Sequence, residues 1–125
     1  MKKLILILLF STVMFSSSSY AEWKWVAKNI NGTFYVDFER IRKHDGYVYW
    51  WWMSDFPKPD ESGSLSITLY SQGDCKLFRF KHLTSTLYKH PMGGGTGDTL
   101  DHSMKWKYPA PSSTGEVILQ SVCNR

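Results

Sequence analysis

The densest run of apolar side chains after the N-terminal region covers residues 46–55, where almost every position is aromatic or β-branched. The run follows an Asp45-Gly46 turn signal and stops before two prolines, so its length and composition predict a β-strand. Alternate side chains of a strand face opposite ways. One face would carry Tyr47, Tyr49, Trp51 and Met53, and the other Val48, Trp50 and Trp52. Because neither face is polar, either the fold covers both or one is left for a partner.

Shorter alternating segments predict the rest of an antiparallel sheet. Residues 23–27 would place Trp23, Trp25 and Ala27 on one side of a first strand. Asn31-Gly32 predicts a type I′ hairpin turn into a second strand at residues 33–37.

Later segments complete the sheet, which we expect to hold about six strands. Asp37 would cap a short helical turn, and the basic residues 42–44 read as a solvated turn. Further strands are predicted at 64–70, 76–88 and, as a short edge, 105–108, with a turn at 72–74 and a flexible loop at 90–98.

One helix is predicted near the C-terminus. Ser113 with Glu116 three positions later forms a capping-box pattern. An apolar stripe follows, made of Val117, Ile118, Leu119 and Val122. A helix of about ten residues is marginal alone, so it must dock on the sheet. The predicted class is therefore α+β, a single antiparallel sheet with a C-terminal helix packed on one face.

The N-terminus indicates export. Two lysines precede an apolar run and a serine tract that ends in Tyr20-Ala21, a pattern typical of a signal peptide over residues 1–21. The mature domain would then be residues 22–125. Because Glu22 rather than a cysteine follows the cleavage site, we expect no lipid anchor, and the protein would lie in the periplasm, at the cell surface or outside the cell. No integral membrane segment is expected after cleavage.

The net charge limits the kind of partner, and the cysteines predict a covalent link. The formal net charge of +4 falls to +2 once Lys2 and Lys3 leave with the leader, too small an excess for a nucleic-acid partner. In an oxidising compartment the only two cysteines, Cys75 and Cys123, would form a disulfide that ties the helix to the sheet; two buried free thiols are the alternative.

No motif for catalysis, a cofactor or a metal stands out. The four histidines lie apart, and the nearest approach to a cluster is Asp98, Asp101 and His102 on a glycine-rich loop. The glycines lack the Gly-Lys-Ser/Thr ending of a phosphate loop. We predict no catalytic residues, no metal site and no cofactor. The enzymatic alternative would use residues 93–97 as a lid over His90, Asp101 or His102.

The high content of aromatic residues says more about function than these weak motifs do, because tryptophan and tyrosine are preferred anchors of protein interfaces. We predict a protein partner and take the strand's aromatic residues as the candidate binding patch; an ordinary aromatic core under the helix is the alternative. One of Trp51 and Trp52, but not both, should be substantially exposed. The candidate patch comprises Tyr47, Tyr49, Trp50, Trp51 and Trp52.

The order of these motifs resembles the surface-adhesin protein E family of Gram-negative bacteria. The resemblance runs over nearly the whole mature chain. It rests on the leader, residues 23–26 and 34–37, the aromatic strand, Asp74-Cys75, the triple glycine at 93–95, Trp106 and the terminal Val122-Cys123.

The resemblance implies an antiparallel sheet with a disulfide-tethered helix, and it allows a homodimer. It also implies a binding module for host matrix proteins such as vitronectin and laminin, which the family's namesake binds. The rival interpretation is a periplasmic or envelope-associated structural protein with no host ligand.

Overall fold

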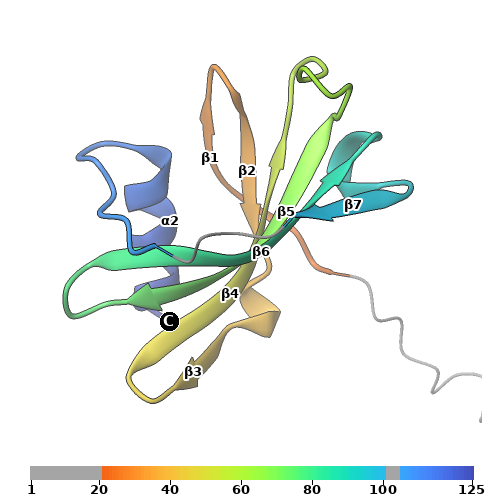
Figure 1. Cartoon of the computed structure of the whole chain (residues 1–125). Helices are drawn as coiled ribbons and strands as arrows, with labels where there is room; N and C mark the ends of the chain where they lie inside the picture. Colours follow the sequence, from red (N-terminus) through yellow and green to blue (C-terminus); the bar gives the residue numbers. More distant parts are fainter. Residues whose placement is uncertain (1–20, 101–104) are drawn as a thin grey trace, which may run out of the picture.

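A single antiparallel sheet with one helix on one face forms the described part of the chain, residues 21–100 and 105–125 of the computed structural model (Figure 1). The predicted leader therefore lies almost wholly outside the described residues. The predicted fold class is confirmed. The strands are β1 (Lys24–Asn29), β2 (Gly32–Val36), β3 (Arg42–His44), β4 (Tyr47–Asp55), β5 (Ser66–Asp74), β6 (Arg79–Tyr88) and β7 (Gly97–Leu100).

Strand β4 is the centre of the sheet, whose strand order is β1-β2-β4-β5-β6-β7. On one side it pairs with β5 over its length from Val48 to Asp55. On its other side, β3 pairs with the first half of β4 and β2 with the second half. The aromatic run thus contacts three neighbouring strands.

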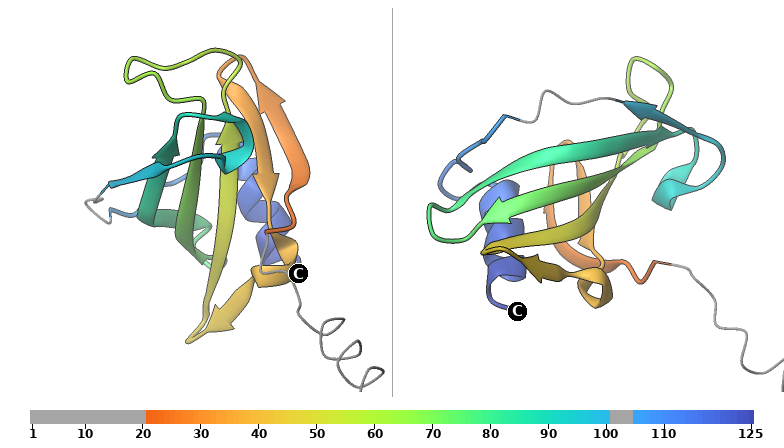
Figure 2. Two further views of the ribbon diagram at one scale, coloured as in Figure 1. Left: turned by 90° about the vertical axis from the view of Figure 1, so that its right-hand side faces the viewer. Right: turned by 60° about the horizontal axis from the view of Figure 1, so that its bottom comes forward.

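The helix α2 (Thr114–Cys123) covers one face of this sheet, which we name the inner face; the opposite one is the outer face (Figure 2). Val48, Trp50 and Trp52 of β4 point inward and pack against the helix. Their partners in the core are Val36, Leu69, Ile118, Leu119 and Val122. Val117, predicted in the apolar stripe, is 39 % exposed, because it lies on the side of the helix turned away from the sheet.

Two local bonds hold α2 in place. The Ser113 hydroxyl accepts the N–H of Glu116 (3.2 Å), as the capping box predicts. The Glu116 carboxylate accepts the N–H of Ser112 (3.2 Å), one residue before the cap. The predicted disulfide between Cys75 and Cys123 is present, with an S–S distance of 2.07 Å, and joins the turn after β5 to the end of the helix.

The first hairpin differs from the predicted one in two details. A bulge between Trp25 and Ala27 breaks the alternation of β1, so Trp25 is 62 % exposed while Ala27 is buried. The turn residues are Ile30 and Asn31, and neither Asn31 nor Gly32 has a positive φ. Gly32 opens β2 instead, where a Cβ would lie 2.5 Å from the Ser54 hydroxyl oxygen.

Three further segments differ from expectation. Strand β5 runs on to Asp74, so the turn lies at residues 75–78. Residues 42–44 form the exposed edge strand β3, because the Asp45-Gly46 turn, with φ of 51° and 82°, folds them back onto β4. The loop predicted at 90–98 contains the 3₁₀ turn η2 (Pro91–Gly93) and the start of β7.

The η2 turn covers one end of the outer face. The N–H of Met92 donates to the Asp55 carboxylate (2.8 Å), and the N–H of Gly93 donates to the Ser66 hydroxyl (2.9 Å). Met53 and Ser66 are fully buried beneath it. A loop therefore closes the far end of the outer face and leaves the end near β3 open.

Candidate functional site

The open part of the outer face carries a row of aromatic rings from two strands. Tyr49 and Trp51 come from β4, and Tyr70 comes from β5 directly opposite Trp51. The ring centroids of Trp51 and Tyr70 are 4.9 Å apart, and those of Tyr49 and Tyr70 are 6.2 Å apart. All three side chains are half-buried. We name Tyr49, Trp51 and Tyr70 the aromatic row.

The structure divides the five predicted patch residues between the two faces. Trp50 and Trp52 are 1 % and 9 % exposed in the core, so including them in a surface patch was wrong. Tyr47, Tyr49 and Trp51 lie on the outer face, and their binding role stays a prediction. Trp51 is half-buried beside Tyr70 and Trp52 is buried, so neither side chain is substantially exposed, contrary to the expectation for this pair.

Trp106 extends this surface beyond Tyr47, whose ring centroid is 5.8 Å away. The sequence predicts a short edge strand at residues 105–108. They form one bridge, in which Lys107 and Phe80 exchange backbone hydrogen bonds of 2.7 and 3.0 Å. The bridge holds the Trp106 ring close to two cations: Arg79 lies 4.3 Å and Lys81 4.6 Å from its centroid.

Asp74 fixes Arg79 beneath Trp106. Its carboxylate accepts the backbone N–H groups of Lys76 (3.1 Å) and Leu77 (3.2 Å) and the Nε–H of Arg79 (3.1 Å). The hydrogen bond from Leu77, with help from Arg79, lowers the pKa of Asp74. Burial works against the charge on Arg79, but its contacts with Asp74 and Tyr108 outweigh this and raise its pKa. Both groups are therefore charged at neutral pH.

Two neighbouring hollows border the aromatic row. One, of about 470 Å³, is lined by Glu39, Arg40, Ile41, Arg42, Trp51 and Tyr70. The other, of about 540 Å³, is lined by Arg42, Lys43, His44, Tyr49 and Tyr70. Because both are lined by Arg42 and Tyr70, these two residues stand at the boundary between the hollows.

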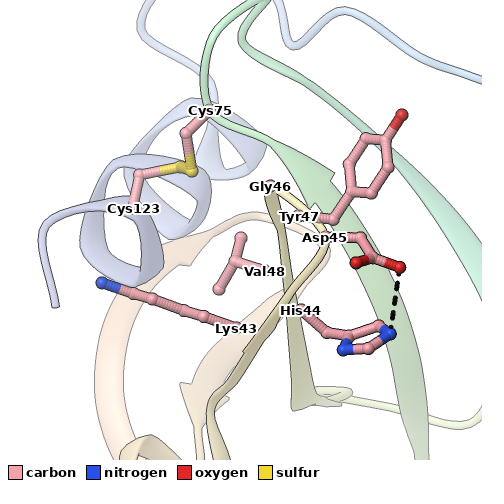
Figure 3. A pocket seen from close by; sticks show the side chains of 8 residues that line it. All are labelled: Lys43, His44, Asp45, Gly46, Tyr47, Val48, Cys75 and Cys123. Carbon is pink, nitrogen blue, oxygen red and sulfur yellow. Dashed lines mark ion pairs between the residues drawn. A yellow bond between two sulfur atoms is a disulfide. The ribbon is translucent and has the colours of Figure 1, made fainter.

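A third hollow, of about 390 Å³, lies at the β3–β4 turn beside the disulfide (Figure 3). There Lys43 extends toward the end of the helix, where it donates a hydrogen bond to the carbonyl of Arg125. His44 forms an exposed ion pair with Asp45 (3.1 Å). This hollow follows the seam between the turn and the disulfide and contains none of the aromatic row.

The structure describes one of the three residues named for an enzymatic alternative. Asp101 and His102 lie outside the described residues, and His90 is exposed at the start of η2. Within residues 21–100 and 105–125, no group of three histidine, cysteine or acidic side chains is arranged to hold a metal ion.

A serine–histidine pair, Ser71 with His82, lies on the inner face; its serine is buried and its histidine is half-buried. The Ser71 hydroxyl accepts the Nε1–H of Trp52 (2.9 Å) and shares a hydrogen bond with His82 Nδ1 (3.0 Å). Ser71 is fully buried, so a substrate could not reach its hydroxyl. The pair satisfies polar groups beneath the helix.

Several solved structures that are similar to this one are of protein E from Haemophilus influenzae. A selenomethionine form of its protein E superimposes with a TM-score of 0.62 and 17 % identity, covering 86 % of this chain and 89 % of that one. Crystal form II of the same protein gives a TM-score of 0.61 and 17 % identity, covering 86 % and 91 %. At this identity the likeness shows the shared fold.

The sequence was also compared with curated proteins and with protein families. No curated protein matches the sequence. Among the described residues, none of the helices has the length and apolar character needed to cross a membrane. The sequence matches the family described as Surface-adhesin protein E over residues 23–124, nearly the whole domain. The chain therefore belongs to the surface-adhesin protein E family, which implies an adhesin-like role and an exported or cell-surface location.

Proposed function

We propose that this protein is a non-enzymatic binding module that is exported without a lipid anchor and contacts a protein partner through its outer face. The observation that carries the proposal is the aromatic row. Three large rings lie side by side on the face that the helix leaves uncovered, and η2 closes only the far end of that face.

The composition of this surface supports a protein partner. Tyrosine, tryptophan and arginine are enriched in interface cores and dominate measured hot spots. Here Tyr49, Trp51 and Tyr70 border two hollows that meet at Arg42. Half-buried rings are held in place by their neighbours, so little side-chain entropy remains to be lost when a partner binds.

Site-specific photo-crosslinking tests the proposal. A photoreactive phenylalanine analogue replaces Tyr70 in the mature chain, residues 22–125, which is mixed with an extract of the native compartment or with host matrix proteins. The matched control carries the analogue at Ile30, which is 91 % exposed at the β1–β2 turn. We expect discrete adducts from position 70 that disappear in the Trp51→Ala variant and persist in Trp25→Ala.

Two outcomes would contradict the proposal. Equal adducts from positions 30 and 70 would indicate unspecific collision, and none from either position would favour a structural envelope protein. An adduct of twice the chain mass would identify a second copy as the partner, and sedimentation of the Trp51→Ala variant would test that homodimer. Protease treatment of intact cells separates surface display from a periplasmic location.

A further inference from the structure

Cations lie on both sides of the aromatic row. In the pairing of β3, β4, β5 and β6, Arg42 lies opposite Tyr49, Tyr49 opposite Gln72, and Gln72 opposite Lys81. These four residues form one line across the outer face. Arg42 ends the line on β3 and Lys81 ends it on β6, so the rings lie between two positive charges.

These two cations lack carboxylate partners within the described structure. The ion pairs there join Arg40 to Asp37, His44 to Asp45 and Arg79 to Asp74. Neither Arg42 nor Lys81 takes part in these ion pairs, and Lys81 lies over the Trp106 ring instead. Lys81 shares that ring with Arg79, whose charge is already paired with Asp74. Of these two cations, Lys81 is the one without a carboxylate partner among the described residues, so it would attract a carboxylate from outside.

The spacing of the charges defines what could fit. Arg42 and Lys81 are separated by three strand-to-strand steps of about 4.8 Å, or about 14 Å in all. An extended peptide covers this distance in about four residues. Tyr49 lies between the two cations with Tyr70 beside it, and these rings favour an apolar or aromatic group there.

The pattern does not suit a polyanion. Nucleic acids and similar chains are bound by many cations, with about six to ten phosphate contacts in typical cases. Here the mature chain has a formal excess of +2, and the two cations at the ends of the line, Arg42 and Lys81, lie on either side of the rings. Glu39 also lines the hollow beside Trp51 and would repel a continuous negative chain.

We infer that the outer face binds an acidic, extended segment of a partner protein, with two carboxylates about four residues apart and an apolar side chain between them. One carboxylate meets the Arg42 guanidinium, whose fork suits bidentate binding, and the other meets Lys81 beside Arg79. The apolar side chain packs on the aromatic row. This inference rests on the proposed function and adds the chemistry of the partner.

Synthetic peptides provide the test. The first probe carries two glutamates four positions apart with a leucine midway; in the second the glutamates become glutamines, and in the third they become lysines. A heparin oligosaccharide serves as the polyanion. Binding to the mature chain is measured by NMR titration at about 50 mM and about 200 mM salt, where screening differs.

We expect the glutamate peptide to bind at least about tenfold more tightly than the glutamine peptide at low salt, and the lysine peptide not to bind. Arg42→Ala and Lys81→Ala should each weaken binding about three- to tenfold. Glu39→Gln should strengthen it about twofold or more, because a like charge leaves the hollow. Lys58→Ala, on an exposed loop, is the charge-matched control and should change nothing.

Other results would overturn the inference. Equal binding of the glutamate and glutamine peptides would show that carboxylates are not required. If neither peptide binds, the outer face does not take such a segment. Tighter binding of heparin at Arg42 and Lys81 identifies a polyanionic partner instead. If crosslinking from position 70 depends on Trp51 but not on Arg42 or Lys81, the proposed function stands and the acidic partner does not.

Discussion

The two faces of β4 carry similar side chains and have different surroundings. Val48, Trp50 and Trp52 lie beneath the helix, and none of these side chains is more than 9 % exposed. Tyr49 and Trp51, one residue away along the strand, contact Tyr70 and remain half-exposed beside two hollows. Composition alone does not distinguish these faces. What distinguishes them is which other segment of the chain covers each one.

The covers also differ in how they are attached. The inner cover is a helix joined to the sheet by a disulfide and by three buried aliphatic side chains, Ile118, Leu119 and Val122. The outer cover is the short η2 turn, held mainly by hydrogen bonds to Asp55 and Ser66. The comparison indicates that the inner face serves stability, whereas the open end of the outer face is available for contact.

The largest expected effect comes from truncating a tryptophan on each face. Trp50→Ala should lower the free energy of unfolding by about 3–5 kcal/mol, because it leaves a cavity beneath the helix. Trp51→Ala, on the half-exposed face, should cost about 1 kcal/mol or less. Urea unfolding of both variants measures the difference. Similar losses for both would show that the outer face is also core and would end the comparison.

Removal of the disulfide should be nearly as costly. The cysteines are 48 residues apart, and closing a loop of that length stabilises the fold by about 4 kcal/mol in the chain-entropy model. We expect the paired Cys75→Ser and Cys123→Ser variant to lose stability and to expose Trp50 to fluorescence quenchers. The aromatic row should still crosslink if the variant folds. Unchanged urea unfolding would show that helix packing alone holds the inner cover.

Adjacent positions on β5 extend the comparison to added volume. A Cβ at Gly73 would lie 2.9 Å from both Trp50 and Val48 side-chain atoms and 3.0 Å from Leu119. Gly73→Ala should therefore destabilise the protein by about 1–3 kcal/mol through overpacking. Its neighbour Gln72 faces outward, and Gln72→Ala should be nearly neutral. Thermal unfolding checks both, and a neutral Gly73→Ala would mean that the helix can move away.

The smallest expected effect is a dependence of the protein's stability on pH, through Asp74. Because the pKa of Asp74 is lowered in the folded state, its carboxylate stabilises the protein above its unfolded pKa of about 3.9. That stability is lost as pH falls through the folded value. We expect Asp74→Asn to be less stable than the natural chain at pH 7, and the difference to shrink as the pH falls below about 3.9. A pH-independent difference would assign the effect to backbone hydrogen bonds alone.

Local patterns predicted much of this fold, because turn and cap signals act over a few residues. The Asp45-Gly46 turn, the Asp37 cap and the Ser113–Glu116 bond all formed where expected. The bulge in β1 was not predictable, because period-two alternation contains no signal for an extra residue. The extension of β5 through Gly73 depends on close contact with Trp50 and the helix, which no local pattern contains.

The candidate site was predictable only in part for the same reason. Alternation along β4 separated Trp51 from Trp52, but it could not say which face the helix would cover. Strand pairing brings two further residues into the site. Tyr70 pairs with Trp51, 19 residues earlier in the sequence, and Arg42 pairs with Tyr49, 7 residues later. Trp106 joins it through a single bridge to Phe80. A tryptophan between lysines near a predicted edge was the available signal.

The position of the helix in the sequence has a consequence for how the protein is made. Helix α2 follows every strand, so the sheet can pair before the segment that shields Trp50 and Trp52 has emerged from the ribosome or crossed a membrane. During that interval the inner face is bare and open to unwanted association. A chaperone that protects nascent chains would therefore contact the inner face before the helix docks, whereas the folded protein presents the outer face.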